Sequence, residues 1–310
     1  MVERLVIDKP GLYQMSAADY HRDPCVEPSL SSSIARELLS NSPKHAWWAH
    51  PRLNPAYESE HKQAFDIGTA AHALLLEGES GCVIVDAKDW RTQAAKDQRD
   101  AAYAAHKVPL LAFRWQEVQD MVEAARRQLA KHEAKPTPFT DGTPEQTLIW
   151  KEGDVWCRAR LDWLHTDRRR IRDYKSTGVT ANPDVWARRS LYGMGYDIQD
   201  AFYTRGLKAV CGIEADFTFV IQETFLPYAL SVVGLEPEPL DLANKKVTHA
   251  IGLWGSCLKA KDFPGYPLRT CWASLPPWEE TQWLERQARD SWARGLEDDG
   301  RPIEEQLNRE

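Results

Sequence analysis

Two carboxylates, Asp162 and Asp173, lie in neighbouring apolar-rich segments, and Lys175 follows the second carboxylate by two positions. The chain between the segments is short and charged, so the segments are predicted to be adjacent strands of one sheet. Side chains alternate between the faces of a strand, so Asp173 and Lys175 point to the same side. In a hairpin, Asp162 then lies beside Asp173. A chain that folds in this way must bring like charges together.

Converging carboxylates require a compensating cation. Two such groups repel each other unless a cation joins them, and hard oxygen ligands favour Mg²⁺ or Mn²⁺. A lysine beside the cation can orient a water molecule or help to deprotonate it, so the trio indicates a hydrolytic site for phosphodiesters. The structural alternatives are a buried ion pair of Asp162 with Arg158 or Arg160, and a simple Asp173–Lys175 pair worth under about 1 kcal/mol if exposed.

Length and composition exclude several classes of protein. The chain has 310 residues, of which 43% are hydrophobic and 27% charged, which is ordinary for a globular protein with a full core. No apolar run approaches the roughly 20 residues that span a bilayer, and the N-terminus has no signal-peptide core, so we expect no membrane association. Six scattered cysteines without a C-x-x-C pair are typical of reduced thiols in a cytoplasmic protein.

The charge balance limits how the chain could bind nucleic acid. A formal net charge of −7 argues against a nonspecific nucleic-acid coat, which would be basic. It is compatible with a nuclease whose positive charge is confined to one groove, because the local field guides a polyanion. The arginines just before Asp173 are a candidate for such charge, although a run of this kind is more often a solvated hairpin tip. They are Arg168, Arg169, Arg170 and Arg172.

The predicted order of elements is helix, three strands, helix and two strands, which gives a mixed α/β core with the carboxylate pair on its central hairpin. The first thirty residues are expected to be loop-like because prolines and a glycine interrupt them. A tight turn is predicted at Glu152-Gly153-Asp154. The predicted strands are 82–85, 146–151, 155–165, 170–175, 216–224 and 228–235. The predicted helices are 34–39, 70–78, 88–107, 115–132, 183–210 with a break near 193–195, 240–261 and 278–296.

Four motifs, which occur along the chain in the right order, resemble those of a known family. Asp162 followed by D-Y-K looks like the core of the PD-(D/E)XK nuclease superfamily. The segment F-D-I-G-T-A-A-H-A-L-L-L-E-G, with His72, resembles the histidine motif of the RecE-type and RecB-type branches. The segment G-Y-D-I-Q-D-A-F-Y resembles their Q-x-x-x-Y motif, with Gln199 and Tyr203. The early L-S-S-S-I-A-R-E-L-L-S-N-S-P-K-H resembles the capped helix that opens RecE-like (exonuclease VIII-type) phage exodeoxyribonucleases.

The resemblance covers roughly residues 12–235, about three quarters of the chain. It implies a restriction-endonuclease-like α/β core, a mixed central sheet flanked by helices, with N- and C-terminal helical extensions. Residues 1–235 would form the nuclease domain, with a helical part at about 1–135 and the catalytic sheet at about 136–235. Residues 236–310 would be a C-terminal helical extension.

The resemblance also implies the roles of five residues. Asp162, Asp173 and the backbone carbonyl of Tyr174 would bind Mg²⁺, for which Mn²⁺ can substitute. His72 would be a further ligand or would position one. Lys175 would orient the attacking water and stabilise charge on the scissile phosphate. One metal ion or two would fit these ligands.

Further residues are expected to support the site or to bind DNA. Gln199 and Tyr203 lie four positions apart on one helical face, so they can act at the same place. In the family they would hold DNA or order the catalytic lysine. Arg36, with the serines at Ser31–Ser33, would bind a 5′ phosphate near a helix N-terminus, where backbone N–H groups favour anions.

The function implied is a metal-dependent exodeoxyribonuclease that degrades one strand of linear double-stranded DNA, from 5′ to 3′. Its product would be a 3′ single strand for a RecT-like single-strand annealing protein, in the cytoplasm of a phage's bacterial host. A ring-shaped trimer or tetramer that encloses DNA ends is expected. Two alternatives stay open: a structure-selective or single-strand endonuclease on the same core, and a catalytically inactive DNA-binding module. The retained charged trio disfavours the inactive module.

Overall fold

The computed structural model describes residues 4–57, 66–78, 81–105, 107–133 and 135–293. The chain divides into two compact units, Met1–Gly265 and Tyr266–Glu310. The second unit contains the helix α10 (Pro277–Ala293), and the last residues of the helix predicted at 278–296 lie outside the described residues. In the described part of the chain, no helix is both long and apolar enough to cross a bilayer.

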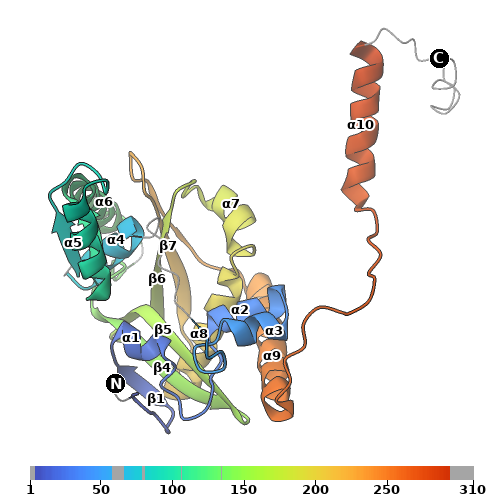
Figure 1. The fold of residues 1–310 in the computed structure, drawn as a ribbon, viewed down its shortest axis with the longest axis horizontal. Helices are drawn as coiled ribbons and strands as arrows, with labels where there is room; N and C mark the ends of the chain where they lie inside the picture. Colours follow the sequence, from blue (N-terminus) through green and yellow to red (C-terminus); the bar gives the residue numbers. More distant parts are fainter. Residues whose placement is uncertain (1–3, 58–65, 79–80, 106, 134, 294–310) are drawn as a thin grey trace, which may run out of the picture. The chain divides into compact units, whose positions relative to one another are not determined.

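A six-stranded mixed sheet forms the centre of the first unit, in the order β1-β4-β5-β6-β7-β8 (Figure 1). Strands β6 and β7 are parallel, whereas the other neighbours are antiparallel. The predicted mixed sheet and its central hairpin are therefore confirmed. The strands are β1 (Gly11–Gln14), β4 (Gly142–Glu152), β5 (Val155–His165), β6 (Arg170–Thr177), β7 (Asp216–Glu223) and β8 (Leu230–Val233).

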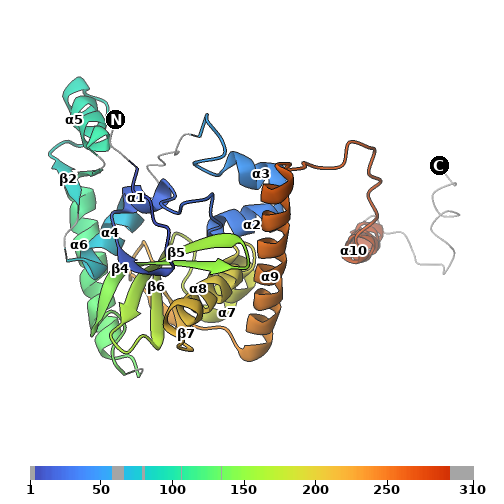
Figure 2. The ribbon, with the colours of Figure 1, turned by 90° about the horizontal axis from the view of Figure 1, so that it is seen from below.

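One face of the sheet is covered by α8 (Tyr196–Cys211), which packs on β4 and β5. Behind it lie α2 (Ser32–Ser40), α3 (Pro43–Trp48) and α9 (Pro237–Ala260), and Figure 2 shows α9 running beside α2 and α8. The core between these layers is largely aromatic and aliphatic. Its largest fully buried side chains include Trp150, Phe202, Phe219 and Trp254.

A second body, here called the lobe, consists of the elements from α4 to α6 and lies on the other side of the sheet (Figure 1). It contacts the sheet through Trp163, Tyr174 and Val220, which share one apolar cluster with its own Val118 and Met121. The elements of the lobe are α4 (Asp66–Leu76), β2 (Cys82–Val85), α5 (Gln93–Ala104), β3 (Val108–Leu111) and α6 (Ala112–Ala130), with β2 and β3 paired in parallel.

Several boundaries agree with the sequence and others differ. The predicted bounds of β2 and β5 are those observed. The predicted break near 193–195 is confirmed, since Gly195 adopts a left-handed φ of 67° just before α8. The loop prediction for the first thirty residues is wrong at β1 and at the short helix α1 (Ala17–His21). Strand β1 exists because β4 offers it a free edge, which the local sequence does not reveal.

The C-terminal extension predicted from residue 236 is divided in the structure. Helix α9 packs against α2 and α8, so it belongs to the first compact unit, which continues to Gly265. The Trp254 side chain of α9 is buried in the main apolar core, which explains why α9 packs with the sheet.

Before α8, the helix α7 (Pro183–Trp186) continues into a π-helical turn, Ala187–Leu191.

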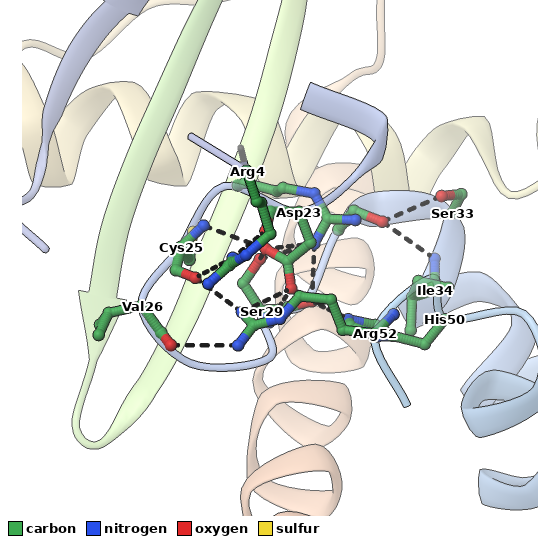
Figure 3. A network of polar contacts seen from close by, with 11 residues as sticks. Arg4, Asp23, Cys25, Val26, Ser29, Ser33, Ile34, His50 and Arg52 are labelled. Carbon is green, nitrogen blue, oxygen red and sulfur yellow. Dashed lines mark hydrogen bonds and ion pairs between the residues drawn. The ribbon is translucent and has the colours of Figure 1, made fainter. Parts of the chain in front are cut away.

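A buried polar network fastens the N-terminal segment to β5 (Figure 3). Asp23 accepts hydrogen bonds from the backbone N–H of Ser29 at 2.9 Å and from its hydroxyl at 2.7 Å. Arg158 lies 3.3 Å from Asp23 and donates to the Ser29 carbonyl at 2.9 Å. Burial by itself raises the pKa of Asp23, but Arg158, His50 and Ser29 outweigh it and hold that pKa well below its usual range. The carboxylate therefore stays charged inside the protein.

The network predicts a large loss of stability on neutralising its carboxylate. Asp23→Asn leaves the buried Arg158 without its anion, so we expect the free energy of unfolding at neutral pH to fall by about 3 kcal/mol. Asp8→Asn, at an exposed position, should change it by less than about 0.5 kcal/mol. Urea unfolding curves of the three proteins test this expectation.

The same comparison has a pH dependence with a definite sign. The pKa of Asp23 is lower in the folded chain than its ordinary value of 3.8. Its contribution is therefore complete above about pH 4 and is lost as the pH falls further. The difference between wild type and Asp23→Asn should narrow from about pH 4 to about pH 2. A difference that stays constant over this range would contradict the assignment.

Candidate active site

Three carboxylates lie in one row across β4, β5 and β6. The register of β4 and β5 puts Glu145 opposite Asp162. The register of β5 and β6, continued by one position, puts Asp173 beside Asp162. Glu145 has a positive φ of 58°, and the ladder between β4 and β5 is interrupted at this position. The pairing of β4 with β5 is therefore interrupted at the position where the negative charges converge.

His72 on α4 completes a cluster with two of these carboxylates. Its Nε2 lies 3.2 Å from Asp162 Oδ2 and 3.4 Å from Glu145 Oε1. The three candidate ligand atoms all lie within 4.8 Å of one another. The two carboxylate oxygens suit Mg²⁺ or Mn²⁺, and the imidazole nitrogen at this spacing can serve as a third ligand. The predicted convergence of His72 and Asp162 is therefore observed.

The electrostatics of the cluster follow from its excess of negative charge. Burial alone lowers the pKa of His72, but Asp162 and Glu145 outweigh it and raise that pKa to about 9. Burial and then Asp162 raise the pKa of Glu145. For Asp162, burial raises the pKa, whereas His72, Lys175 and the backbone N–H of Tyr174 lower it by more. The imidazole thus carries a proton that a bound cation would replace.

Asp173 lies deeper than the cluster and is fully buried. One of its oxygens forms an ion pair with Lys175, and the other accepts a hydrogen bond from Gln199 Nε2 at 2.6 Å. Burial and then Asp162 raise the pKa of Asp173 to about 7. Burial lowers the pKa of Lys175, but Asp173 and Asp162 outweigh it and raise it to about 12, so the lysine stays charged. Asp173 therefore anchors Lys175 and Gln199.

A cleft of about 550 Å³ opens over these groups. Its walls come from α1, from α4, from the start of α8 and from the three strands that carry the carboxylates. The cleft presents charged and hydrogen-bonding side chains beside aromatic rings. The lining residues include Tyr20, His21, Thr69, His72, Glu145, Arg160, Asp162, Tyr174, Lys175, Ser176 and Tyr196.

The structural alternatives for the carboxylates can now be judged. Arg158 pairs with Asp23, and Arg160 pairs with Glu145, so neither arginine neutralises Asp162. Asp162 instead accepts a hydrogen bond from the backbone N–H of Tyr174 at 2.9 Å, besides its contact with His72. Asp162 is therefore held in place without an arginine, facing the cleft.

The supporting residues divide into two groups. Gln199 reaches the site through Asp173, whereas Tyr203, one turn later, is buried and packs edge-on against Phe217 at 6.0 Å. Tyr203 thus lies in the core rather than facing the cleft. Arg36 donates to the Met194 carbonyl at 3.2 Å, away from the lining of the cleft.

The remaining predicted residues have local partners. The Ser33 hydroxyl lies 3.0 Å from that of Ser31, which caps α2. Neither serine lines the cleft. The role of these serines in binding a 5′ phosphate stays a prediction. The same holds for Asp173 and for the backbone carbonyl of Tyr174 as metal ligands, since the cluster of candidate ligand atoms in the described residues contains His72, Glu145 and Asp162.

Glu145 was absent from the residues predicted from sequence. A signal for it exists in the predicted turn, where Glu152 pairs with Val155 across two residues. Counting back along the two strands from this pair puts Glu145 opposite Asp162. The register of a hairpin, rather than a motif, would have identified it.

Residues 31–271 match the family described as a PDDEXK-like domain of unknown function (DUF3799). The chain therefore belongs to this family and to the PD-(D/E)XK nuclease superfamily. It is similar to the solved structure of a predicted exonuclease from Eubacterium rectale, with 11% identity, a TM-score of 0.53, and coverage of 87% of this chain and 98% of that one. This likeness shows a shared fold.

A phage-related exonuclease from Haemophilus somnus 129PT is also similar, at 13% identity and a TM-score of 0.29, over 66% of this chain and 98% of that one. No curated protein matches the sequence.

The cluster predicts that Glu145 contributes to cation binding. Glu145→Gln removes one anionic ligand and frees the positive charge of Arg160, so we expect the affinity for Mn²⁺ to fall by about tenfold or more. Isothermal titration calorimetry with Mn²⁺ measures it. Glu77→Gln changes a carboxylate that lines the same cleft outside the cluster and should bind Mn²⁺ like wild type. Equal affinities for Glu145→Gln and wild type would remove Glu145 from the site.

Proposed function

We propose that this protein is a Mg²⁺-dependent exodeoxyribonuclease that degrades one strand of linear double-stranded DNA from 5′ to 3′. The observation that carries the proposal is the convergence of His72, Glu145 and Asp162 in an open cleft beside the charged Lys175. Membership of a PDDEXK-like family supports hydrolysis of a phosphodiester. The fold shared with a predicted exonuclease supports action at DNA ends.

The cation, when bound, supplies Lewis-acid charge to a phosphate oxygen and to a water. His72, Glu145 and Asp162 would hold it, with Mg²⁺ as the natural ion and Mn²⁺ able to substitute. The remaining chemistry belongs to Lys175. Its ammonium group, held by Asp173, can orient the attacking water and stabilise negative charge on the scissile phosphate. Gln199 fixes Asp173 from the other side and so keeps Lys175 aimed at the cleft.

The wider context follows from the motifs that resemble RecE-like enzymes. We propose that the 3′ single strand passes to a RecT-like annealing protein for recombination, in the cytoplasm of a phage's bacterial host. A ring-shaped trimer or tetramer would enclose the DNA end. With a net charge of −7, the protein would present its positive charge to DNA inside such a ring rather than on its exterior.

Digestion of linear and closed-circular duplex DNA tests this function. With Mg²⁺, wild type should degrade linear DNA only and should release a 5′ label before a 3′ label. Lys175→Ala should lose about 100-fold or more of the rate, because the charge that stabilises the phosphate is gone. Lys151→Ala, at an exposed position on β4, is the matched control and should cut normally.

The other outcomes each contradict part of the proposal. Cutting of the circle would indicate an endonuclease, and early release of the 3′ label would reverse the polarity. Chelation with EDTA should stop all cutting, and an excess of Mg²⁺ should restore it. Cutting that survives EDTA would remove the cation from the mechanism. A wild-type protein that binds DNA and cuts none would indicate a binding module.

A further inference from the structure

The cation cluster is assembled from two bodies of the protein. His72 belongs to α4 in the lobe, whereas Glu145 and Asp162 belong to the sheet. Its geometry therefore depends on how the lobe is seated on the sheet. A metal or catalytic constellation tolerates displacements of only about 0.5 Å, so the seating must be fixed by specific contacts.

Gln222 on β7 makes one of these contacts. It is fully buried, and its Oε1 accepts a hydrogen bond from the Tyr174 hydroxyl at 2.8 Å. Its Nε2 donates to the backbone carbonyl of Met121, in the middle of α6, also at 2.8 Å. One side chain thus joins two strands of the sheet to the longest helix of the lobe. In a dry interior both bonds are directional and costly to lose.

Tyr174 carries this contact to the cluster. Its backbone N–H donates to Asp162 Oδ2, the same oxygen that faces His72. Its ring centroid lies 6.2 Å from that of His72. Tyr174 therefore touches both halves of the cluster, while Gln222 holds its hydroxyl. A shift of Gln222 would change the position of Tyr174 between the two halves.

Gly68 makes a second contact between the lobe and the sheet. A Cβ added at Gly68 would collide with the hydroxyl oxygen of Ser176 on β6. Gly68 lies four residues before His72, so the two share one face of α4. The missing side chain lets the turn that precedes His72 approach β6 directly. A Cβ here would force either the Ser176 hydroxyl to turn aside or this turn, and His72 with it, to move away from the carboxylates.

We propose that Gln222 is a positioning residue of the cation site and that, with the Gly68–Ser176 contact, it sets the spacing between His72 and the carboxylates. The inference rests on the cation role of the cluster, which is part of the proposed function, and is independent of the DNA substrate. Gln222 is not part of the cluster of His72, Glu145 and Asp162 and does not line the cleft, so it acts through Tyr174.

The Gly68–Ser176 contact allows a test by rescue. Gly68→Ala in the full-length protein should weaken Mn²⁺ binding by about 10- to 100-fold in calorimetry. Adding Ser176→Gly removes the colliding hydroxyl and should bring the affinity back to within about twofold of the Ser176→Gly single variant. Gly178→Ala is the control, because a Cβ there meets nothing within 4 Å. It should bind Mn²⁺ like wild type.

Gln222→Met tests the hydrogen bonds themselves, since it removes those to Tyr174 and Met121, and a longer one of 3.4 Å to the Tyr228 carbonyl, and nearly keeps the volume. We expect Mn²⁺ affinity to fall by about tenfold or more while the circular dichroism spectrum stays native. Gln128→Met is the matched control. Gln128 also joins α6 to the sheet by bonds to Tyr228 and Leu230, but makes none to Tyr174. It should lower the melting temperature similarly and change Mn²⁺ affinity much less.

The outcomes separate this inference from the proposed function. It is overturned if Gly68→Ala binds Mn²⁺ like wild type, if Ser176→Gly fails to rescue it, or if the two glutamine variants lose equal affinity. A wild-type protein that binds no Mn²⁺ overturns both proposals. A wild-type protein that binds Mn²⁺ and loses it in Gly68→Ala, but cuts no DNA, supports the positioning role and contradicts only the nuclease.

Discussion

Repulsion among carboxylates in one row of the sheet is the constraint to which the rest of the structure responds. Asp162 lies between Glu145 and Asp173. Each carboxylate has its own compensation from a different source. Lys175 comes from the same strand as Asp173, Arg160 from the strand beside Glu145, and His72 from the lobe. The lobe is therefore part of the electrostatic balance of the sheet. A divalent cation would satisfy the same row more completely than a protonated imidazole.

Strand β5 carries two charged sites, one in which the charges are paired and one in which negative charge is in excess. Arg158 and Asp162 lie on the same face, four residues apart, because side chains alternate along a strand. Arg158 pairs with the Asp23 carboxylate and donates hydrogen bonds to the carbonyl and the hydroxyl of Ser29. This network holds the N-terminal segment against β5. Around Asp162 the negative charge exceeds the positive charge and faces a cleft. A satisfied buried network stabilises a fold, whereas an unbalanced one beside a cleft indicates a site for a ligand.

Local patterns identified the central strands, but not what depends on pairing. The bounds of β5 follow from an apolar run between a tight turn and a charged tip. Strand β1 has four residues and exists through its pairing with β4, so the pattern gave no signal. Glu145 needed the hairpin register, which one turn could have supplied. Helical spacing puts Gln199 and Tyr203 on one face, yet the small angular offset sends one to Asp173 and the other into the core. Which neighbour fills each direction is decided by tertiary packing.

The central claim is that a divalent cation binds where the lobe meets the row of carboxylates. Anomalous diffraction from crystals grown with Mn²⁺ tests it most directly. The account predicts a peak bonded to His72 Nε2 and to oxygens of Asp162 and Glu145, at about 2.0–2.3 Å. A manganese ion held by other residues, or a cluster in which His72 keeps its contacts with both carboxylates in saturating Mn²⁺, would contradict it.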